Sequence, residues 1–330
     1  MNKYLNFLTN KRLRFSVLAR KGFYKNMSDE NFLKEKYKLS YGKDLDLKNP
    51  QTYNEKLQWL KINDRNPIYT TMVDKCEAKK YVADIIGKEY TIPTLGVWDK
   101  FEDIDFDSLP NQFVLKCTHD SGGLVVCRNK KELNLKFAKK KIKKTLKLNY
   151  FWAGREWPYK NVKPRIIAEQ FISAHGQYNA PTSVESSVSC DELQAKHGLL
   201  DYKFMCFDGK VKALFLDIGV IGTGTGHAEE YYRNVYDRDG NLLPVKETRD
   251  NYPEKVVLPD NLAKMVEVAE KLSTGIPHLR VDLYNFGGNS IKVGEMTFYH
   301  GSGISNVFMP EEWNTTFGSW IDCKKAFCSK

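Results

Sequence analysis

The sequence feature that most constrains the fold is a β-hairpin near the carboxyl end. Residues 279–286 and 291–299 each alternate apolar with polar side chains, which is the period of a half-buried strand. Gly288 and Asn289 stand between them and suit a two-residue turn, because both tolerate the left-handed backbone that such turns need. The hairpin therefore predicts a sheet with one apolar, buried face.

A two-residue turn fixes the register of this hairpin. Asp282 then lies opposite Glu295, and Arg280 opposite Thr297, with all four side chains on the face away from the apolar residues. Carboxylates directly opposite each other repel, and a divalent cation such as Mg²⁺ removes the repulsion because hard cations bind carboxylate oxygens. The pattern indicates either a metal site or two carboxylates that face water. A bulge or a three-residue turn would shift this register.

Composition indicates a soluble, globular protein of a reducing compartment. The chain has 330 residues, enough for two or three domains, of which 42% are hydrophobic and 28% charged. It has no apolar run long enough to cross a membrane, and its first residues lack the apolar core and cleavage site of a signal peptide. Seven cysteines without metal-ligand spacing favour the cytoplasm.

The net charge of +10 favours negatively charged binding partners. Basic side chains are concentrated near the amino terminus and in residues 130–147, and they suit nucleic acid, an anionic membrane or anionic substrates. Nucleic acid is not expected, since no zinc-finger, RNP or helix-turn-helix pattern occurs. Residues 1–45 are expected to be helical. They either lie on the inner face of the membrane or pack on the rest of the chain, and their uneven apolar spacing favours packing. No oligomeric state is indicated.

Cap and turn signals divide the rest of the chain. Thr52 and Glu55 form a capping box, and Asp74 is expected to cap the next helix. Residues 173–199 are polar and rich in turn formers, which predicts an irregular insertion. Residues 219–226 are glycine-rich but lack the spacing of a dinucleotide site. Expected helices cover residues 75–86, 130–147 and 261–273; expected strands cover 91–98, 112–116, 124–127 and 165–172; a hairpin around Asp208-Gly209 covers 201–217.

A glycine-containing loop between two short strands is a candidate phosphate site. Ser121, Gly122 and Gly123 end the loop CTHDSGG and can close their backbone N–H groups over phosphate, because glycine lets the main chain approach closely. Lys116 ends the preceding strand and can place an ammonium group on a phosphate. Such loops are also common as structural turns, so the pattern alone leaves both interpretations open.

In this order the elements resemble the ATP-grasp superfamily and are most similar to its TupA-like branch, linked to teichuronic acid and capsular polysaccharide biosynthesis. The resemblance covers residues 40–320. It rests on the motifs NPQTYNEKLQWLK, MVDK, LPNQFVLKCTHDSGG, RIIAEQFI, DYKFMCFDGK, LRVDLY and GEMTFYHGSG. It implies an α+β fold in which two α+β subdomains enclose ATP, residues 71–172 with the phosphate loop and residues 173–330 with the metal site. A helical N-terminal region, residues 1–70, precedes them.

The resemblance also implies roles for individual residues. ATP would be bound by Lys75, Lys116, Ser121, Gly122, Gly123, Glu169, Gln170, Phe171, Ile172, Asp201 and Lys203, with the backbone of residues 169–172 at the adenine edge and Asp201 at the ribose. Mg²⁺ would be held by Asp282, Glu295 and Thr297. Arg280 and Lys116 would act in catalysis. The loop that follows, His300, Gly301, Ser302 and Gly303, is a candidate for contact with substrate.

Two residues depart from the superfamily pattern. Thr297 stands where many members have Asn, which leaves the number of Mg²⁺ ions open. Lys79 stands where Arg is expected, and this change loses bidentate pairing.

The implied chemistry is an ATP-dependent carboxylate–amine ligation. A carboxylate attacks the γ-phosphate of ATP and becomes an acyl phosphate, from which an amine then displaces phosphate. Lysines, Arg280 and Mg²⁺ would stabilise charge on the phosphoryl and carbonyl oxygens. The expected partners are a carboxylated or amino sugar of a surface polysaccharide or its precursor, and an amino acid or other amine.

Three other functions stay open at this point. A glycosyltransferase would need an Asp-x-Asp motif in a nucleotide-sugar domain, and the near match at residues 103–105 lies in a polar turn. An ATP-dependent sugar kinase remains, since the same frame supports phosphoryl transfer. A non-enzymatic nucleotide sensor is disfavoured, because the metal carboxylates and the phosphate lysines are all present.

Overall fold

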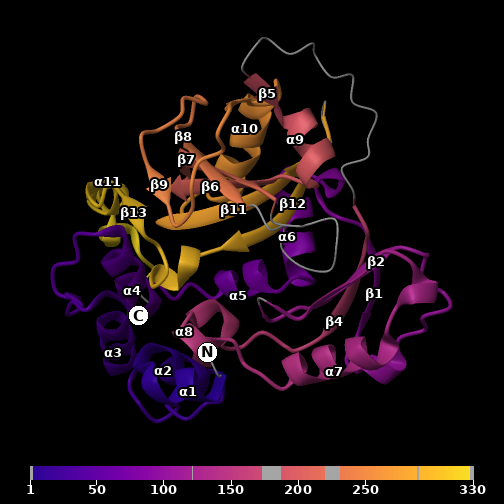
Figure 1. Ribbon diagram of the computed structural model, residues 1–330, viewed down its shortest axis with the longest axis horizontal. Helices are drawn as coiled ribbons and strands as arrows, with labels where there is room; N and C mark the ends of the chain where they lie inside the picture. Colours follow the sequence, from indigo (N-terminus) through magenta and orange to yellow (C-terminus); the bar gives the residue numbers. More distant parts are fainter. Residues whose placement is uncertain (1–2, 121, 173–186, 220–230, 288–289, 328–330) are drawn as a thin grey trace.

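The structure is a computed structural model that describes residues 3–120, 122–172, 187–219, 231–287 and 290–327, and the statements below concern these residues. Its frame is two antiparallel sheets, each covered by helices, with a further group of helices at one end (Figure 1). This mixture of helix and sheet confirms the predicted α+β class. None of the described helices combines the length and the apolar character needed to span a bilayer.

The larger sheet contains both predicted hairpins. Its strands follow the order β12 (Ile291–Thr297), β11 (His278–Asn285), β6 (Asp201–Phe207), β7 (Lys210–Ile218) and β8 (Tyr232–Tyr236). Asp208 and Gly209 join β6 to β7 with φ values of 50° and 74°, the left-handed backbone that a two-residue turn requires. The carboxyl-terminal hairpin is formed by β11 and β12.

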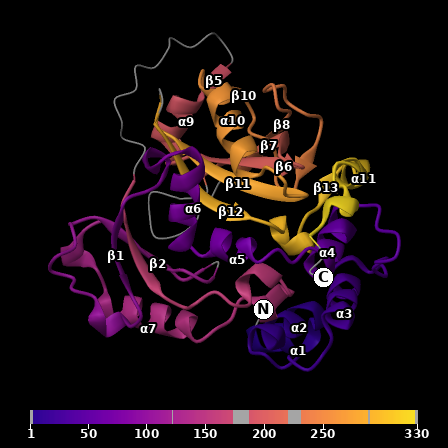
Figure 2. The ribbon, with the colours of Figure 1, turned by 180° about the vertical axis from the view of Figure 1, so that it is seen from behind.

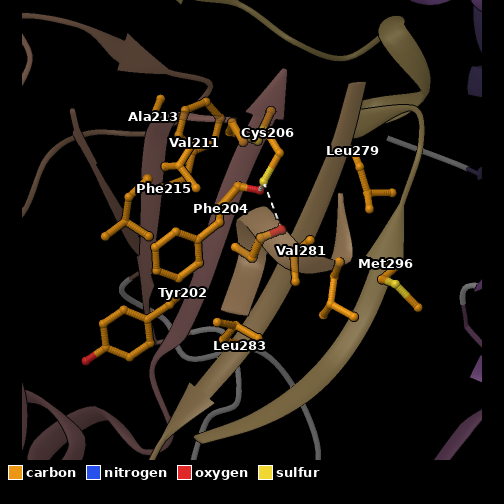
Figure 3. Packing of buried hydrophobic residues seen from close by; sticks show 14 of the residues in the cluster. Tyr202, Phe204, Cys206, Val211, Ala213, Phe215, Leu279, Val281, Leu283 and Met296 are labelled. Atoms are coloured by element: carbon orange, nitrogen blue, oxygen red, sulfur yellow. Dashed lines mark hydrogen bonds between the residues drawn. The ribbon is translucent and has the colours of Figure 1, made fainter. Parts of the chain in front are cut away.

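One face of the larger sheet is apolar and is covered by α10 (Leu262–Leu272), as the helical spacing of its apolar residues predicts. Tyr202, Phe204 and Val281 point to this side and are fully buried (Figure 3). Cys206 approaches the helix closely enough for its Sγ to lie 3.7 Å from the carbonyl oxygen of Ala269. Each such buried side chain contributes about 1.5–3 kcal/mol, so this face anchors the sheet.

The opposite face of the larger sheet is divided. Its first part is aromatic and lies under α4 (Tyr53–Asn63) and α11 (Glu312–Ser319), where Tyr53 packs edge-on against Phe207 and His278. Its second part carries charged side chains, among them Lys203 and Asp282, which are direct neighbours on β6 and β11. The aromatic part packs the sheet against α4 and α11, and the charged part is not covered by these helices.

The smaller sheet has the strand order β1 (Thr94–Trp98), β4 (Ile166–Gln170), β2 (Phe113–Cys117) and β3 (Leu124–Cys127). Its apolar face packs on α7 (Leu135–Leu146) through Leu115, Ala168 and Ile142. Because side chains alternate along a strand, Lys116 and Glu169 project from the other face. The helices α5 (Ile68–Val73) and α6 (Glu77–Ile86) lie between the two sheets (Figure 1).

The amino-terminal segment forms α1 (Lys3–Thr9), α2 (Lys11–Arg20) and α3 (Asp29–Tyr41), at the end of the molecule away from β1 (Figure 1, Figure 2). Phe15, Phe32 and Leu33 are buried there, which confirms the prediction that this segment packs on the body of the protein. The contact centres on Arg155, which follows the short helix α8 (Phe151–Gly154) and is 1% exposed.

Arg155 holds the amino-terminal helices by several contacts. Its guanidinium lies 4.3 Å from the ring centre of Phe32, and its Nη2 donates to the carbonyl oxygen of Tyr24 at 2.6 Å. Its Nε lies 3.0 Å from a carboxylate oxygen of Asp29. Burial lowers the pKa of Arg155 and the charge of Asp29 opposes that effect. Arg155 therefore links α3 and the loop before it to α8.

Two sequence-based expectations are corrected here. Residues 187–197, within the segment expected to be irregular, form β5 (Ser187–Ser189) and α9 (Cys190–His197), because a second capping box starts the helix and its Leu193 is buried. Residues 173–186 and most of the glycine-rich segment 219–226 lie outside the described residues. The helix expected from residue 75 begins at Glu77, and the carboxylate of Asp74 accepts hydrogen bonds from the N–H groups of Cys76 and Glu77. The remaining short strands are β9 (Lys246–Glu247), β10 (Lys255–Val257) and β13 (Phe308–Met309).

The role of Arg155 predicts a large loss of stability when it is replaced. Arg155→Met keeps the apolar bulk but leaves the carbonyl oxygen of Tyr24 without its partner, so we expect the free energy of unfolding to fall by about 3 kcal/mol. Urea unfolding followed by tryptophan fluorescence measures this. Lys34→Met, at an exposed ion pair of α3, should change stability by less than about 0.5 kcal/mol. Equal urea midpoints for Arg155→Met and wild type would show that Arg155 does not stabilise the packing of the amino-terminal helices.

Candidate active site

The carboxyl-terminal hairpin has the predicted pairing at its charged end but not the predicted turn. Asp282 pairs with Glu295 and Arg280 with Thr297, as expected. The N–H of Phe286, however, donates to the carbonyl oxygen of Ser290, which leaves three residues between them instead of two.

A bulge at Gly294 compensates for the longer turn. After the pair of Asp282 and Glu295, the register shifts so that Leu283 pairs with Val293. The extra residue of the turn and the extra residue of the bulge cancel, and the predicted register holds only at the charged end. A Cβ atom on Gly294 would lie 2.9 Å from the ring of Tyr284, so any larger residue at the bulge would displace that ring. A glycine inside a strand is the signal that could have revealed it.

Arg280 joins the two opposed carboxylates. Its Nε and Nη2 donate to the two carboxylate oxygens of Asp282 at 2.6 and 2.7 Å, and Nη2 also donates to Glu295 at 2.7 Å. The repulsion from which a metal was inferred is therefore relieved by a guanidinium within the protein. Thr297 donates its hydroxyl to Glu295 at 3.2 Å. In the ranges that the structure describes, no three His, Cys, Asp or Glu side chains are arranged as a metal site, so the metal stays a prediction.

On its other side Arg280 reaches the loop η5 (His300–Gly303). Its Nη1 lies 2.9 Å from Nδ1 of His300. Because a guanidinium can only donate, Nδ1 accepts and the ring proton sits on Nε2, which lies 3.8 Å from Glu247. Burial lowers the pKa of His300, which agrees with a neutral ring at pH 7. Glu247 is paired in turn with Arg233.

Further contacts on β6, β7 and β8 connect Glu247 back to Asp282, so the contacts form a closed ring. Arg233 donates to Asp217 at 2.6 Å, and Lys203 lies 3.6 Å from Asp217 and 3.3 Å from Asp282. We call these side chains the Arg280 network; its members are Arg280, His300, Glu247, Arg233, Asp217, Lys203 and Asp282. Burial opposes the charge on Lys203, but the carboxylates around it, Asp201 first, outweigh burial and raise its pKa.

The network carries an excess of negative charge. Asp201 contacts Lys203, and its second oxygen is buried without a hydrogen-bond partner among the described residues. Burial raises the pKa of Asp201 to about 6. When Asp201 and Glu295 are added, five carboxylates face three cationic side chains. This excess of two suits a divalent cation, which hard oxygen ligands prefer.

A second charged cluster lies on the smaller sheet. Lys116 and Lys79 each place an ammonium group 2.6 Å from a different oxygen of Glu169. Burial alone raises the pKa of Glu169, but the two lysines outweigh it and leave the pKa below its usual value. Lys75 donates to the carbonyl oxygen of Asp120 in the candidate phosphate loop. Sequence reasoning noted Lys79 only as a departure from the superfamily pattern, because its contact with Glu169 joins α6 to a strand that is distant along the chain.

The two clusters meet at one cleft. Lys75, Lys79, Lys116 and Glu169 line it from one side, and Glu295 lines it from β12. The remaining walls are largely apolar and include Met72, Val73, Val82, Ile92 and Met296. The cleft thus combines cationic side chains on one wall with apolar side chains on the others.

Several predicted residues that the structure describes do not line this cleft: Asp201, Lys203, Arg280, Asp282 and Thr297 on the larger sheet, and Gln170, Phe171 and Gly123 at the smaller one. Gln170 and Phe171 border a separate groove, and the N–H of Gln170 donates to the carbonyl oxygen of Pro93 at 3.0 Å. The N–H of Gly123 donates to Asp120 at 2.9 Å instead of lying open. Ser121 lies outside the described residues, Gly122 is exposed, and Ile172 is half-buried.

The loop η5 is held in an unusual conformation. Gly301, Ser302 and Gly303 have φ values of 55°, 55° and 57°, and Ser302 is the one among them with a side chain that this region disfavours. Lys61 fixes it by donating to the carbonyl oxygen of Ser302 at 2.8 Å and to its Oγ at 3.0 Å. Gln58 donates to the carbonyl oxygen of Gly303 at 2.8 Å. Strain held by such contacts is typical of functional loops.

Comparison with known proteins adds three findings. A family model described as "TupA-like ATPgrasp" matches residues 55–180 and 187–322. A D-alanine–D-alanine ligase from Helicobacter pylori is similar in structure, with 13% identity, a TM-score of 0.41 and coverage of 83% of this chain and 68% of that chain. An L-amino acid ligase from Bacillus licheniformis has 17% identity, a TM-score of 0.41 and coverage of 91% and 58%. No curated protein was found to be similar to this chain in sequence.

The burial of Lys61 predicts a specific dependence of stability on pH. Burial lowers the pKa of Lys61 from 10.5 to about 7, although Glu156 opposes the effect. Between these values the unfolded chain binds more protons than the folded chain, so stability rises with pH. Lys61→Met removes this contribution. The unfolding free energy of wild type minus that of the variant should therefore rise by about 1 kcal/mol per pH unit from pH 8 to 10 in urea unfolding. A constant difference would show that Lys61 is not desolvated.

Proposed function

The chain belongs to the TupA-like ATP-grasp family and is an ATP-grasp enzyme, and we propose on that basis that it joins a carboxylate to an amine at the expense of ATP. The observation that carries the proposal is the charge of the cleft. Lys75, Lys79 and Lys116 line one side, and Glu295, bound to Arg280, lines the other. Such a cleft neutralises phosphates on one side and presents metal-binding oxygens on the other.

The residues present suit ATP and Mg²⁺. The three lysines would hold the phosphates, and the apolar walls would cover the adenine. Asp201 has a buried oxygen without a partner, which a ribose hydroxyl would satisfy. Asp282 and Glu295, in a network with two excess carboxylates, would hold Mg²⁺ with the hydroxyl of Thr297 beside them. When bound, Mg²⁺ would neutralise phosphate oxygens of ATP. ATP would thus lie between two subdomains, residues 71–172 and 173–330.

The proposed reaction has two steps. An oxygen of the acceptor carboxylate forms a bond to the γ-phosphorus, and the bond to ADP breaks. The amine nitrogen then attacks the carbonyl carbon of the acyl phosphate, inorganic phosphate leaves, and the nitrogen loses a proton. Arg280 would stabilise charge on the oxygens in both steps, since Asp282 and His300 hold its guanidinium in place.

The acceptor that we propose is a carboxylated or amino sugar of a surface polysaccharide or its precursor, joined to an amino acid or other amine. The loop η5 supports this placement, because His300 contacts Arg280, and Gly301 and Ser302, which follow it, are partly exposed. Cysteines in the described part of the chain are unpaired, among them the half-buried Cys76 and Cys323, which supports a cytoplasmic location. Contact with the inner face of the membrane stays a prediction.

Binding of ATP with Mg²⁺ should stabilise the protein against heat. At ligand concentrations 100-fold above the dissociation constant, the gain of about 2.7 kcal/mol corresponds to a melting midpoint roughly 5 °C higher. Glu295→Gln should lose most of the Mg²⁺-dependent rise. Glu267→Gln, on the exposed face of α10, should keep it. An unchanged rise in Glu295→Gln, or no rise in wild type at millimolar ATP, would contradict the proposed site.

Hydroxylamine trapping would distinguish a ligase from the other enzyme classes. With ATP, Mg²⁺, hydroxylamine and a panel of uronic acids, an acyl phosphate gives a hydroxamate, ADP and phosphate. Arg280→Lys loses the bidentate contact with Asp282, so hydroxamate formation should fall about 100-fold. A stable phosphate ester without hydroxamate would identify a sugar kinase instead. Turnover of a nucleotide sugar without ATP would identify a glycosyltransferase.

A further inference from the structure

A second cavity, of about 390 Å³, lies between the amino-terminal helices and the loop η5. Its walls come from α2, from α3, from residues 150–156 around α8, and from residues 301–305. None of these residues lines the ATP cleft. Four parts of the chain that are far apart in sequence thus enclose a space of the size that ligand sites occupy.

The charge of this cavity is strongly positive. Arg12, Arg20 and Lys36 line it, and Glu156 is the single carboxylate among its lining residues. Within the described residues neither Arg12 nor Arg20 has a hydrogen-bond or ion-pair partner in the protein. Lys36 donates to the carbonyl oxygen of Ala153 at 2.6 Å, so its ammonium group is fixed at the wall. Two guanidinium groups are therefore free to bind an anion.

A fourth basic side chain lies directly behind the cavity. Lys61 is fully buried and binds Ser302, a lining residue. Burial lowers the pKa of Lys36 to about 8; Glu156 opposes this, and the charges of Arg20 and Arg12 add to it. Like charges that lower one another's pKa relax when an anion binds among them. The cavity therefore favours the binding of an anion.

The cavity also adjoins the reacting centre. His300 contacts Arg280 of the network, and Gly301 and Ser302, which follow it, line the cavity. Tyr150 of the cavity packs at 4.9 Å against Tyr159, which lines the ATP cleft. The loop η5 therefore lies between the cavity and Arg280 and contacts both.

We propose that this cavity binds the phosphate-bearing part of the acceptor, so that the acceptor is a sugar that carries a phosphate or diphosphate group. Arg12 and Arg20 bind the phosphate oxygens, because a guanidinium pairs with two phosphate oxygens at once. The net charge of the lining residues matches a dianion better than a single carboxylate. This inference rests on the proposed function, since it takes η5 as the path to the reacting carboxylate.

Calorimetric titration of the full chain with inorganic pyrophosphate tests the proposal. Arg12→Ala/Arg20→Ala should weaken pyrophosphate binding at least tenfold and leave ATP binding unchanged. The matched control is Lys11→Ala/Lys21→Ala, which removes the same charge at the two ends of α2 from exposed residues outside the cavity. Lys116→Ala should weaken ATP binding and leave this pyrophosphate site intact. Melting midpoints establish that each variant is folded.

Three results would overturn the proposal: no binding of pyrophosphate to wild type at millimolar concentration, equal weakening in the control, or binding lost only in Lys116→Ala. The last would assign the anion to the ATP cleft. Failure of ATP to bind wild type would instead refute the proposed function, and the titrations separate the two. Tighter binding of a nucleoside diphosphate sugar than of pyrophosphate would support the proposal and identify a nucleotide carrier. Tighter binding of a short prenyl diphosphate would support it with a lipid carrier.

Discussion

The structure depends on the guanidinium group of Arg280. This one side chain is hydrogen-bonded to Asp282 on its own strand, to Glu295 on β12 and to His300 in η5. Opposed carboxylates on neighbouring strands destabilise a sheet, and a buried charge without a partner costs several kcal/mol. Arg280 removes both penalties, and by doing so it fixes the distance between the acidic hairpin and the loop that follows it.

The electrostatics of the two sheets are complementary. On the larger sheet, cationic side chains bridge carboxylates of neighbouring strands, and two carboxylates remain in excess. At the smaller sheet, Lys79 of α6 and Lys116 of β2 outnumber Glu169 of β4, the carboxylate that they share. The larger sheet therefore favours binding of a cation, and the smaller sheet favours binding of an anion. A metal-bound polyphosphate supplies both, which explains why the chain keeps such costly groups at a single cleft.

The sequence predicted most of the fold and the pairing of Asp282 with Glu295, because alternation and turn residues are local signals. It missed that a three-residue turn and the bulge at Gly294 offset each other, since either one alone is compatible with the same strands. It missed α9 because its capping box lies in a polar stretch. The contact of His300 with Glu247 and the sharing of Glu169 by two lysines were not predictable, since they join residues distant along the chain. The basic cavity requires four separate segments and likewise has no local signal.

The central claim is that the enzyme activates a carboxylate as an acyl phosphate, and transfer of oxygen-18 tests it most directly. A uronic acid labelled in its carboxylate is turned over with ATP and an amine, and the released phosphate is analysed by mass spectrometry. The attacking oxygen stays on phosphorus when the amine displaces phosphate from the carbonyl carbon. Our account predicts that the released phosphate carries the label. Amide product with unlabelled phosphate would contradict it.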